Sequence, residues 1–553
     1  MFFPLALLVL AHQVASNQTC RCIPGDACWP SGYEWARFNA SIGGKLVASQ
    51  QLASVCHDPT YDAAQCNYMR QNWIQPWLHD ASSSSIMAAA VANESCDAFT
   101  PRAQPCVAGS TVAYAVKASD ASDIAQTISF ARSKNVRLVV RNTGHDYMGK
   151  STGAGALAVW THHMKKTEAV WYNSTHYSGR AIRLGAGVQV EEAYEAAGRA
   201  RAVVVGGDCD TVGVTGGYLQ GGGHSALSSL HGMAADAILE WEVVDGRGRL
   251  LTATRHHHRD LYWALSGGGG GTYGVAVSVV VKAHADTPVA GAQLRFGSVD
   301  APAFDAAVAK YHDHLLPALT AANGTAIAQI TSSTFLLSPL TLPGATNGTA
   351  HTLLTPLLNH LDAANIPYDL NLTHSASWID HWRRLIKPNP TQRVQNAQYG
   401  GWLVPRDVHP ADLRRQVRTI TDAGCVFVAI ALDASRNHAE NAVLPAWRTA
   451  AMNVILSTPW PLAADLAQMK ARADLMTKTC VPALARLAPD AGAYLNEADP
   501  NQPDWKRAFY GANYDRLLRV KRAYDPHDVF YAHTAVGSDA YHLDADGRLC
   551  RSL

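Results

Sequence analysis

The alternation of apolar and polar positions divides the chain into stretches of different character. From Thr111 onward, short runs rich in β-branched residues alternate with longer runs in which apolar residues recur every three to four positions. The first pattern predicts strands and the second predicts helices. The strands are expected at 111–116, 136–142, 181–187 and 201–207, and the helices at 119–135 and 190–200. This alternation indicates an α/β arrangement up to about Ala285.

The pattern changes in the second half of the chain. Glycines become rarer between about Thr287 and Asn396, and a long helix is predicted over 301–322. A strand follows at 425–432, and a helical stretch runs over 461–487. We therefore expect a second domain at 288–492. Residues 493–553 again carry glycine, asparagine and tyrosine motifs, so this end of the chain is expected to return to the first domain.

The N-terminus predicts export from the cell. Residues 1–16 read MFFPLALLVLAHQVAS, a short apolar core followed by small residues, as in a cleaved secretory signal. The alternative is an anchoring helix, but a span needs roughly 20 apolar residues and this run is shorter. Seven N-x-[ST] sequons also suggest a secreted glycoprotein with surface loops at those points. They are Asn17, Asn39, Asn93, Asn173, Asn323, Asn347 and Asn371.

Composition and charge exclude some classes of partner. The 553 residues are 48% hydrophobic and 16% charged, with a formal net charge of +1. That balance gives no reason to expect a nucleic-acid or polyacidic partner, and no later stretch is apolar enough to cross a membrane. A chain of this length is expected to form at least two domains.

The number of cysteines is odd. Seven of the eleven lie in the first 106 residues, which predicts a disulfide-rich N-terminal segment over 17–107. Pairing in an oxidising compartment would leave one cysteine over. Counting alone does not identify which one remains.

Two glycine-bearing motifs carry candidate chemistry. The first, RNTGHDYMGKS at 141–151, follows a predicted strand, and its turn would let backbone N–H groups converge on an anion such as a pyrophosphate. A solvated loop is the alternative for its His145. The second, VGGDCDTVGVTGGYLQGGGH at 205–224, places glycines among valines and tyrosine, which favours backbone packed against a flat group over a flexible linker. It lacks the spacing of a Rossmann fingerprint.

Two further blocks complete an ordered set. They are RDLYWALSGGGGGTYGV at 259–275 and FYGANYDRL at 509–517. In this order the four blocks resemble the berberine bridge enzyme-like flavoproteins of the vanillyl-alcohol oxidase superfamily, over about 108–287 and 493–536. The resemblance implies a two-domain α+β fold. A discontinuous FAD-binding domain, 108–287 with 493–553, would pack on a substrate domain with an antiparallel sheet and covering helices.

The resemblance also implies covalent attachment of FAD. In this family the histidine of the [ST]-x-G-H-[DS] loop bonds the flavin 8α-methyl, which corresponds to His145. In bicovalent members a cysteine three residues before a Val/Ile-Gly pair bonds flavin C6, which corresponds to Cys209. A neutral imidazole and a thiolate are suited to such additions. Using Cys209 would leave ten cysteines for five disulfides; the alternative is a thiol at Cys209 and a single bond. Asp210 stands where many relatives have proline.

The same resemblance implies which residues surround the cofactor. Besides His145 and Cys209, we expect contacts from both glycine motifs, from the strand after the third block and from the fourth block. The expected cofactor-binding residues are Arg141, Asn142, Thr143, Gly144, Asp146, Gly149, Ser151, Gly207, Val212, Gly213, Gly216, Gly217, Gly221, Gly222, Gly223, Val275, Asn513 and Tyr514.

Catalytic roles are inferred from the family as well. Relatives with valine at the position of Val212 tend to react with O2, which favours an oxidase that releases hydrogen peroxide. Hydride transfer from a substrate alcohol to flavin N5 requires a base for the hydroxyl proton. Relatives have Tyr-x-Asn-Tyr where this chain reads Tyr494-Leu-Asn-Glu497. Tyr494, Glu497 and Tyr147 are therefore the candidates, although Glu497 could instead pair with a neighbouring Arg or Lys.

Other features are discounted, and alternatives for the function remain. His256, His257 and His258 are adjacent on a polar turn and are expected to be solvated, and His224 has no carboxylate or cysteine at metal-site spacing. We expect a secreted monomer that acts on a small-molecule substrate and O2. The alternatives are a dehydrogenase with another electron acceptor, or a flavin-binding protein that has lost catalysis. The sequence does not choose between a sugar, an alkaloid and an aromatic alcohol.

Overall fold

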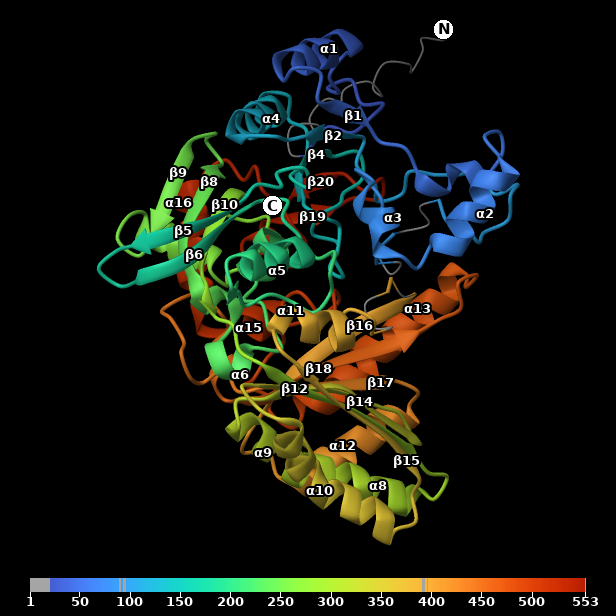
Figure 1. The fold of residues 1–553 in the computed structure, drawn as a ribbon. Coiled ribbons are helices and arrows are strands. Elements are labelled where there is room, and N and C mark those ends of the chain that lie inside the picture. Colours follow the sequence, from blue (N-terminus) through green and yellow to red (C-terminus); the bar gives the residue numbers. More distant parts are fainter. Residues whose placement is uncertain (1–19, 89–90, 93–95, 390–392, 395, 553) are drawn as a thin grey trace, which may run out of the picture.

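The first half of the chain forms two larger sheets, and the 142–156 loop that carries His145 connects two strands of the first (Figure 1). The computed structural model describes residues 20–88, 91–92, 96–389, 393–394 and 396–552. The predicted signal 1–16 and the sequons Asn17 and Asn93 lie outside these residues. The first sheet has the order β1-β2-β4-β3, and its last three strands are parallel. Its strands are β1 (Leu46–Ala48), β2 (Tyr114–Lys117), β4 (Leu157–Trp160) and β3 (Leu138–Arg141).

The second sheet is antiparallel and follows the order β5-β6-β10-β8-β9. Its strands are β5 (Thr167–Asn173), β6 (Ser178–Gly185), β10 (Gly274–Lys282), β8 (Ile238–Asp245) and β9 (Leu250–Thr254). The predicted helix 119–135 is α4 (Ala121–Ser133), which begins where Asp120 accepts a hydrogen bond from Asp123 N at 3.0 Å. The helix predicted at 190–200 is α5 (Val190–Arg199). Of the strand predicted at 201–207, only β7 (Ala202–Val203) pairs, with β11 (His284–Ala285), and the rest enters the glycine-rich loop.

The second domain is built on a seven-stranded antiparallel sheet of order β15-β12-β14-β13-β17-β18-β16. Its strands are β15 (Tyr368–Ser375), β12 (Val289–Gly297), β14 (Thr334–Pro343), β13 (Thr325–Ile330), β17 (Val426–Ala431), β18 (Ala450–Pro459) and β16 (Ala397–Pro405). Helices cover one face of this sheet (Figure 1). They are α8 (Ala301–Lys310), α9 (Leu316–Ala321), α10 (Asn347–Ala363) and α12 (Pro410–Asp422). The predicted α+β architecture, with an antiparallel sheet and covering helices, is confirmed.

Two predicted helices are interrupted. The one expected at 301–322 is divided into α8 and α9 by a π-helical turn over Tyr311–Leu315. Pro317, in the first turn of α9, has no N–H to donate to the preceding turn, which explains the break. The stretch 461–487 similarly divides into α13 (Leu466–Leu475), a π-helical turn over Met476–Cys480 and α14 (Val481–Ala485).

The end of the chain packs on the first domain. α16 (Tyr514–Tyr524) lies against α7 (Arg259–Leu265), and α15 (Trp505–Tyr510) precedes it. The buried Lys521 ammonium pairs with Asp525, whose carboxylate also accepts hydrogen bonds from the backbone N–H groups of Val529 and Phe530, both at 2.9 Å. This network fixes the turn that leads to β19 (Tyr541–Leu543) and β20 (Leu549–Arg551).

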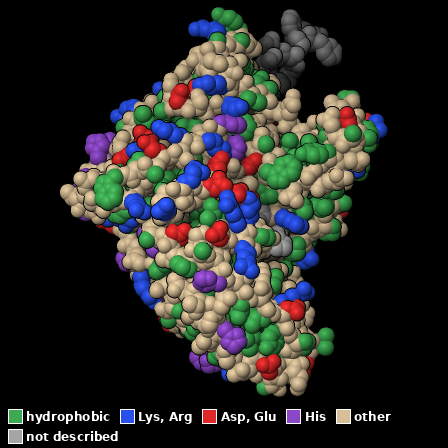
Figure 2. Space-filling view, in the orientation of Figure 1, with side chains coloured by type: hydrophobic (Ala, Val, Ile, Leu, Met, Phe, Trp, Pro, Cys, Tyr) green, Lys and Arg blue, Asp and Glu red, His purple; other side chains and the backbone are tan. Residues whose placement is uncertain are grey.

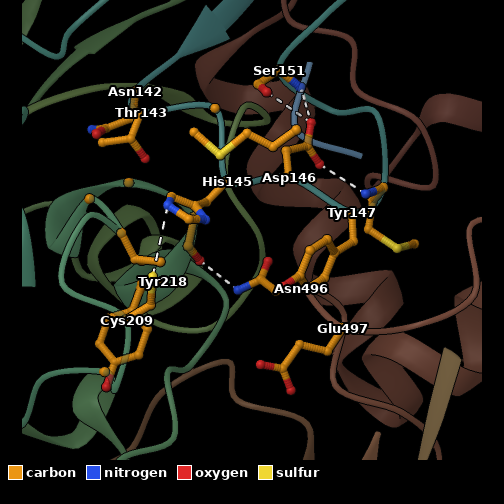
Figure 3. A pocket seen from close by; sticks show the side chains of 18 of the residues that line it. Asn142, Thr143, His145, Asp146, Tyr147, Ser151, Cys209, Tyr218, Asn496 and Glu497 are labelled. Atoms are coloured by element: carbon orange, nitrogen blue, oxygen red, sulfur yellow. Dashed lines mark hydrogen bonds between the residues drawn. The ribbon is translucent and has the colours of Figure 1, made fainter. Parts of the chain in front are cut away.

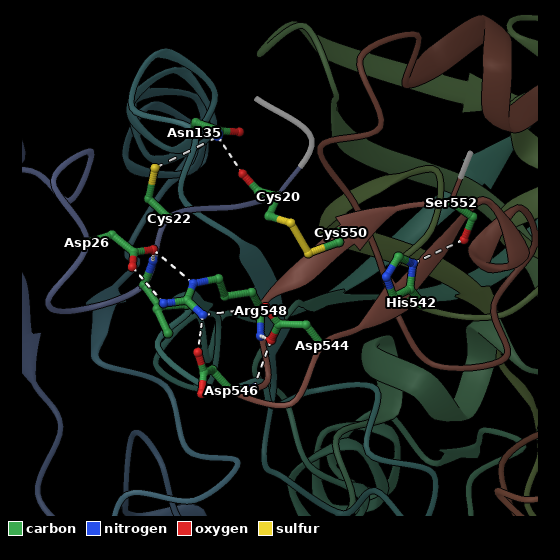
Figure 4. Close-up of a disulfide and its surroundings, with 11 residues drawn as sticks. Cys20, Cys22, Asp26, Asn135, His542, Asp544, Asp546, Arg548, Cys550 and Ser552 are labelled. Atoms are coloured by element: carbon green, nitrogen blue, oxygen red, sulfur yellow. Dashed lines mark hydrogen bonds and ion pairs between the residues drawn. A yellow bond between two sulfur atoms is a disulfide. The ribbon is translucent and has the colours of Figure 1, made fainter. Parts of the chain in front are cut away.

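A disulfide joins the two ends of the described chain. Cys20 is bonded to Cys550, and Arg548 beside it pairs with Asp26 at 2.8 Å (Figure 4). The N-terminal segment that follows Cys20 carries α1 (Gly32–Ser41), α2 (Ala63–Asn72) and α3 (Pro76–Asp80). The remaining bonds are Cys22–Cys28, Cys56–Cys66, Cys96–Cys106 and Cys425–Cys480. Ten cysteines thus form the five expected disulfides, and Cys209 is the one outside them.

Charges of both signs meet where the two domains touch. Basic and acidic side chains intermingle near the middle of the face shown in Figure 2, with no extended region of one sign there. Lys387, after α11 (Trp378–His381), pairs with Glu191 of α5 at 2.6 Å and with Asp210 at 3.7 Å. Asp210, the departure from the family pattern, is therefore held by the second domain.

The five sequons within the described residues differ in exposure. Asn173, Asn347 and Asn371 are exposed, whereas Asn39 and Asn323 are half-buried and accept hydrogen bonds from Leu46 N and from Arg436. Glycosylation at these sites stays a prediction. Within the part of the chain that the structure describes, no helix is long and apolar enough to span a bilayer.

Candidate functional site

One large cavity lies where the loops of the first domain face the seven-stranded sheet. Its volume is about 530 Å³, within the range of sites that hold small molecules. Both glycine motifs and the Tyr494–Glu497 segment contribute to its lining. Of the predicted residues, those lining the cavity are Asn142, Thr143, Gly144, His145, Asp146, Tyr147, Ser151, Gly207, Cys209, Val212, Gly213, Gly216, Gly217, Tyr494 and Glu497.

The loop after β3 presents His145 to the cavity (Figure 3). Gly144 has φ +91°, and a Cβ there would lie 2.6 Å from the Arg141 guanidinium, so glycine is required. Asp146 closes the loop by accepting hydrogen bonds from Met148 N at 3.0 Å and from Ser151 N at 2.7 Å. The local sequence therefore folds back on itself and leaves the imidazole facing inward.

His145 and Cys209 lie next to each other on one side of the cavity. The imidazole Nε2 is 2.7 Å from Thr211 Oγ1 and 3.9 Å from Cys209 Sγ. The thiol is also 3.6 Å from the Thr211 hydroxyl. Burial, together with the nearby His79 and Arg141, lowers the pKa of His145 to about 3. The imidazole is therefore neutral at physiological pH, as a nucleophile must be.

The thiol of Cys209 differs from the thiolate expected from the sequence. Burial raises its pKa to about 11, although hydrogen bonding to Thr211 opposes the shift. Asp210, next to it, acts in the same direction as burial. At neutral pH the side chain is therefore the protonated, less nucleophilic form, and the two candidate attachment residues differ in readiness to react.

Glu497 lies across the cavity from Cys209, in the loop between α14 and α15 (Figure 3). Its carboxylate lies 3.0 and 3.2 Å from His224 Nε2 and accepts a hydrogen bond from Asn453 Nδ2 at 2.9 Å. Its partners are thus a histidine and an amide, and the expected alternative of an Arg or Lys partner is not what the structure contains. The carboxylate faces the cavity from a fixed position.

His224 was missed as a site residue because its carboxylate partner is 273 positions away in the sequence. Burial alone would lower the pKa of His224, but Coulombic attraction and hydrogen bonding to Glu497, together with Asp208, raise it. No spacing rule could reveal this pair. Only the return of the chain to the first domain brings the two side chains together.

The two candidate tyrosines are held as neutral phenols. Burial raises the pKa of Tyr494 and of Tyr147 far above the usual value, and the Glu497 charge adds to both shifts. Tyr494 Oη accepts a hydrogen bond from Asn496 Nδ2 at 2.8 Å. Tyr147 stacks on Tyr399 with ring centroids 4.1 Å apart. Of the three candidates for a base, only Glu497 is a carboxylate with its oxygens at the cavity.

Asp208 is a second carboxyl group in the cavity lining. Burial raises its pKa to about 6, His224 opposes the shift, and Glu497 adds to it. A raised carboxyl pKa means that the folded state binds the proton more tightly than the unfolded state does. The free energy of unfolding should therefore fall as pH rises from about 4, where the carboxyl ionises in the unfolded chain, to about 6, where it ionises in the native protein.

Asp208→Asn removes this penalty. At pH 7.5 we expect the variant to melt about 2–4 °C above the wild-type protein, and near pH 4 the two should melt together. Thermal denaturation followed by circular dichroism at both pH values measures the difference. An equal Tm at pH 7.5, or a lower one, would contradict an ionised, desolvated Asp208.

Several predicted cofactor residues are not among those that line this cavity, and their contact with a cofactor stays a prediction. Arg141 is buried and donates to the carbonyls of His79 and Ser82, both at 3.2 Å. Asn513 donates to the carbonyls of Ala442 and Val443, and the Tyr514 hydroxyl donates to Asp539.

The glycines and valine in this group pack against other side chains. Gly149 lies against Val91, and Val275 of β10 belongs to a buried core. The nearest side chains to Gly221, Gly222 and Gly223 are Asn496, Val443 and Tyr218 respectively. These residues shape the wall without reaching the cavity surface.

The remaining lining fits a flat ring system. Gly217 and Gly270 offer bare backbone, since a Cβ added there would meet no atom closer than 3.8 and 3.5 Å respectively. At Gly213 a Cβ would lie 2.0 Å from Asn142 Oδ1, so the position of the Asn142 side chain requires glycine at residue 213. Asn142 Oδ1 is buried and has no hydrogen-bond partner among the described residues. A planar ring would pack against this wall of bare backbone. An N–H group of that ring would donate a hydrogen bond to the Asn142 oxygen beside the wall.

Metal chemistry finds no support in the described residues. No group of three or more His, Cys, Asp or Glu side chains there is placed to hold an ion. His256 and His257 are exposed, as predicted, whereas His258 is half-buried and its Nδ1 lies 3.3 Å from the Tyr524 hydroxyl.

Comparisons with known proteins agree with this geometry. The family model described as FAD binding domain matches residues 112–254, and the model described as Berberine and berberine like matches 493–537. FAD-linked oxidoreductase patO of Aspergillus clavatus is 56% identical over 541 residues, which cover 96% of this chain and 94% of that protein. VAO-type flavoprotein oxidase VAO615 of Thermothelomyces thermophilus is 39% identical, with 99% of each chain covered.

A solved structure has the same fold throughout. The crystal structure of VAO-type flavoprotein MtVAO615 from Myceliophthora thermophila C1 matches with a TM-score of 0.92 at 39% identity. The match covers 97% of this chain and 100% of that one.

Proposed function

Because the chain belongs to the berberine bridge enzyme-like FAD-linked oxidoreductases of the vanillyl-alcohol oxidase type, we propose that it is an oxidase with covalently bound FAD. His145 would hold the flavin, and Cys209 would form a second bond. Glu497 would take the proton of a substrate hydroxyl, and O2 would be the final electron acceptor. When bound, the flavin supplies the hydride acceptor.

The observation that carries this proposal is the placement of three groups around one cavity. His145 and Cys209 lie 3.9 Å apart on one side, and Glu497 with its two partners lies on the other. A planar group between them would meet two nucleophiles at one edge and a carboxylate across its face. Nothing else in the described lining combines these functions.

Each covalent bond would replace one C–H of the cofactor and the N–H or S–H of the side chain by a C–N or C–S bond. Each releases two protons and two electrons, and O2 takes up the electrons to give hydrogen peroxide. The neutral imidazole of His145 is ready for this reaction, whereas the Cys209 thiol must first lose its proton. We therefore propose that the histidyl bond forms first.

Glu497 would act on the substrate at its carboxylate oxygens. His224 and Asn453 hold the carboxylate at two oxygens, which leaves the cavity-facing lone pairs to accept the hydroxyl proton. Removing that proton makes the adjacent C–H a better hydride donor. Asn496, which donates to Gly217 O and to Tyr494 Oη at 2.8 Å each, ties the segment carrying Glu497 to the glycine wall.

The reaction with O2 is tested at Val212. Its side chain lines the cavity three residues after Cys209, where one added methylene would narrow the approach. We expect Val212→Ile to slow reoxidation of the reduced enzyme about tenfold, equivalent to about 1.4 kcal/mol, and to leave substrate reduction unchanged. Stopped-flow mixing of reduced enzyme with O2, together with peroxide release, measures both. Wild-type enzyme that reoxidises only with a quinone would instead be a dehydrogenase.

Secretion is part of the proposal. The apolar N-terminus, the sequons and the five disulfides together support an oxidising, extracellular setting. Tethering would also keep the cofactor from being lost outside the cell. The intact mass of protein collected from culture medium, before and after removal of N-glycans, tests signal cleavage and glycosylation.

A further inference from the structure

The cavity has a second wall that the proposed chemistry does not use. It is the face of the seven-stranded sheet opposite the covering helices, where alternate residues of β13, β17 and β18 point inward. We call it the sheet wall. Its residues are Ile327, Gln329, Val426, Val428, Ile430, Ile455 and Ser457.

The register of the strands arranges these side chains in rows. Ile327 lies opposite Ile430, Gln329 opposite Val428, and Val428 opposite Ile455. Val426 lies opposite Ser457. The middle of the wall is therefore made of β-branched aliphatic groups, and the two polar side chains lie at its margins. Such side chains have few rotamers, so the surface is rigid and apolar.

The wall begins at Glu497. Asn453, which donates to the Glu497 carboxylate, is the residue opposite Ile430 in the register. From Ile430 to Val426 the strand extends roughly 13 Å, at about 3.3 Å per residue. A molecule whose hydroxyl meets Glu497 would thus lay its body along aliphatic side chains for the length of one or two rings.

The charged groups of the cavity lie away from the middle of the sheet wall. Asp146 is engaged within its own loop, and Asp208 and Lys150 lie on the side of the glycine motifs. Lys150 Nζ is 3.4 Å from Leu495 O, and burial lowers its pKa to about 8. Apart from Glu497, the charged residue of the described lining near the sheet is Arg393, and it is exposed to solvent. The wall itself presents no ion pair partner for a charged substrate.

We infer that the substrate is an uncharged alcohol with a compact apolar body, and that a sugar is a poor substrate. This inference rests on the proposed oxidase function. A sugar would place several hydroxyls on the wall, where the polar side chains that face them are Gln329, Ser457 and, on the neighbouring β16, Tyr399. Each hydroxyl buried without a partner is expected to weaken binding about tenfold. An apolar body gains about threefold to fourfold per buried methylene.

A panel of substrates tests the inference on the holoenzyme. Anaerobic stopped-flow would follow flavin bleaching by primary alkanols of increasing length, by benzyl alcohol, by glucose and by maltotriose. We expect the second-order rate of bleaching to rise about threefold to fourfold per methylene until the wall is covered. Glucose and maltotriose should react at least a hundredfold more slowly than the best alkanol, about 2.7 kcal/mol. Fast bleaching by the sugars, or no dependence on chain length, would overturn the inference.

A binding measurement separates this inference from the proposed function. Tertiary alkanols have no hydrogen on the carbinol carbon and are not oxidised, so their effect on the flavin spectrum reports binding alone. Methyl glucoside, whose blocked anomeric carbon cannot be oxidised to a lactone, is the sugar used for comparison. Tight binding of tertiary alkanols without bleaching by any primary alkanol would support the apolar site and contradict the oxidase. Bleaching by sugars alone would contradict the apolar site and support the oxidase.

One substitution localises the effect to the wall. Val428→Thr keeps the shape but puts a hydroxyl at the centre of the apolar rows, and should weaken tertiary-alkanol binding about fivefold or more. Val299→Thr makes the same change at a fully exposed position and should leave binding unchanged. Equal affinities in the two variants would place the apolar body elsewhere. The wild-type panel decides the inference even if the Val428 variant fails to fold.

Discussion

In the His145→Ala variant, acid precipitation is expected to release the flavin into the supernatant, whereas the wild-type protein should retain it in the pellet. His145 is neutral and faces the cavity, so it can bond the flavin directly. The Cys209 thiol, with a pKa near 11, is ionised in only roughly one molecule in ten thousand at pH 7. Without the imidazole, the remaining bond should form slowly or incompletely. Peptide mass analysis of both attachment peptides completes the measurement.

The reciprocal variant should behave differently. Cys209→Ala is expected to retain nearly all of its flavin through the histidyl bond, and the double variant should hold it only non-covalently. If the His145→Ala protein instead kept its flavin on the Cys209 peptide, the order of attachment proposed above would be wrong. Flavin released by acid from the wild-type protein would reject covalent attachment altogether.

Two substitutions at Thr211 form a matched pair for the same measurement of protein-bound flavin. Its hydroxyl holds Nε2 of the His145 ring at 2.7 Å, which leaves Nδ1 as the nitrogen available for bonding. Thr211→Val removes the hydroxyl at nearly constant shape and should lower the bound fraction of flavin. Thr211→Ser should restore it, since serine keeps the hydroxyl. Equal incorporation in the two variants would mean that the ring is positioned by packing alone.

Much of the architecture follows from local sequence. The helices at 121–133 and 190–199 were predicted because their apolar residues recur at helical spacing, and Asp120 supplies a cap. The interruption at Pro317 was missed, since a π-helical turn depends on packing around the proline as well as on its missing N–H. Six of the seven strands of the second-domain sheet also escaped the pattern, since only β17 was predicted. Strands β14 and β16 are buried on both faces for much of their length and do not alternate.

The candidate site, like the fold, could be predicted from the sequence only in part. His145 and Cys209 were predicted because each stands in a motif whose order along the chain is informative. Their contact with each other, and the thiol pKa that separates their chemistry, depend on burial, which a motif does not record. Val428 and Ile455 could have been suspected from strand alternation, but not their position opposite the glycine wall.

Glu497→Gln is expected to slow flavin reduction by the substrate about 10²–10⁴-fold, the usual contribution of a positioned base. Glutamine keeps the size of the side chain and can still accept a hydrogen bond from Asn453, but it cannot take up the hydroxyl proton. The covalent flavin, the visible spectrum and Tm should change little. Anaerobic stopped-flow with a saturating alcohol measures the rate. Glu440→Gln, at a side chain that is 78% exposed, is the matched control and should be indistinguishable from wild type.

A substitution at His224 tests whether Glu497 acts as a base or only as a structural carboxylate, because His224 affects the reaction through Glu497. The pKa of His224 is raised by the adjacent Glu497, and His224→Gln removes this titrating group, so the substitution should move a limb of the pH–rate profile. A purely structural role would lower the rate at every pH without moving the limb. Tyr494→Phe and Tyr147→Phe should each cost far less than Glu497→Gln, since both phenols are held protonated. A larger loss in either tyrosine variant would transfer the role of base to that residue.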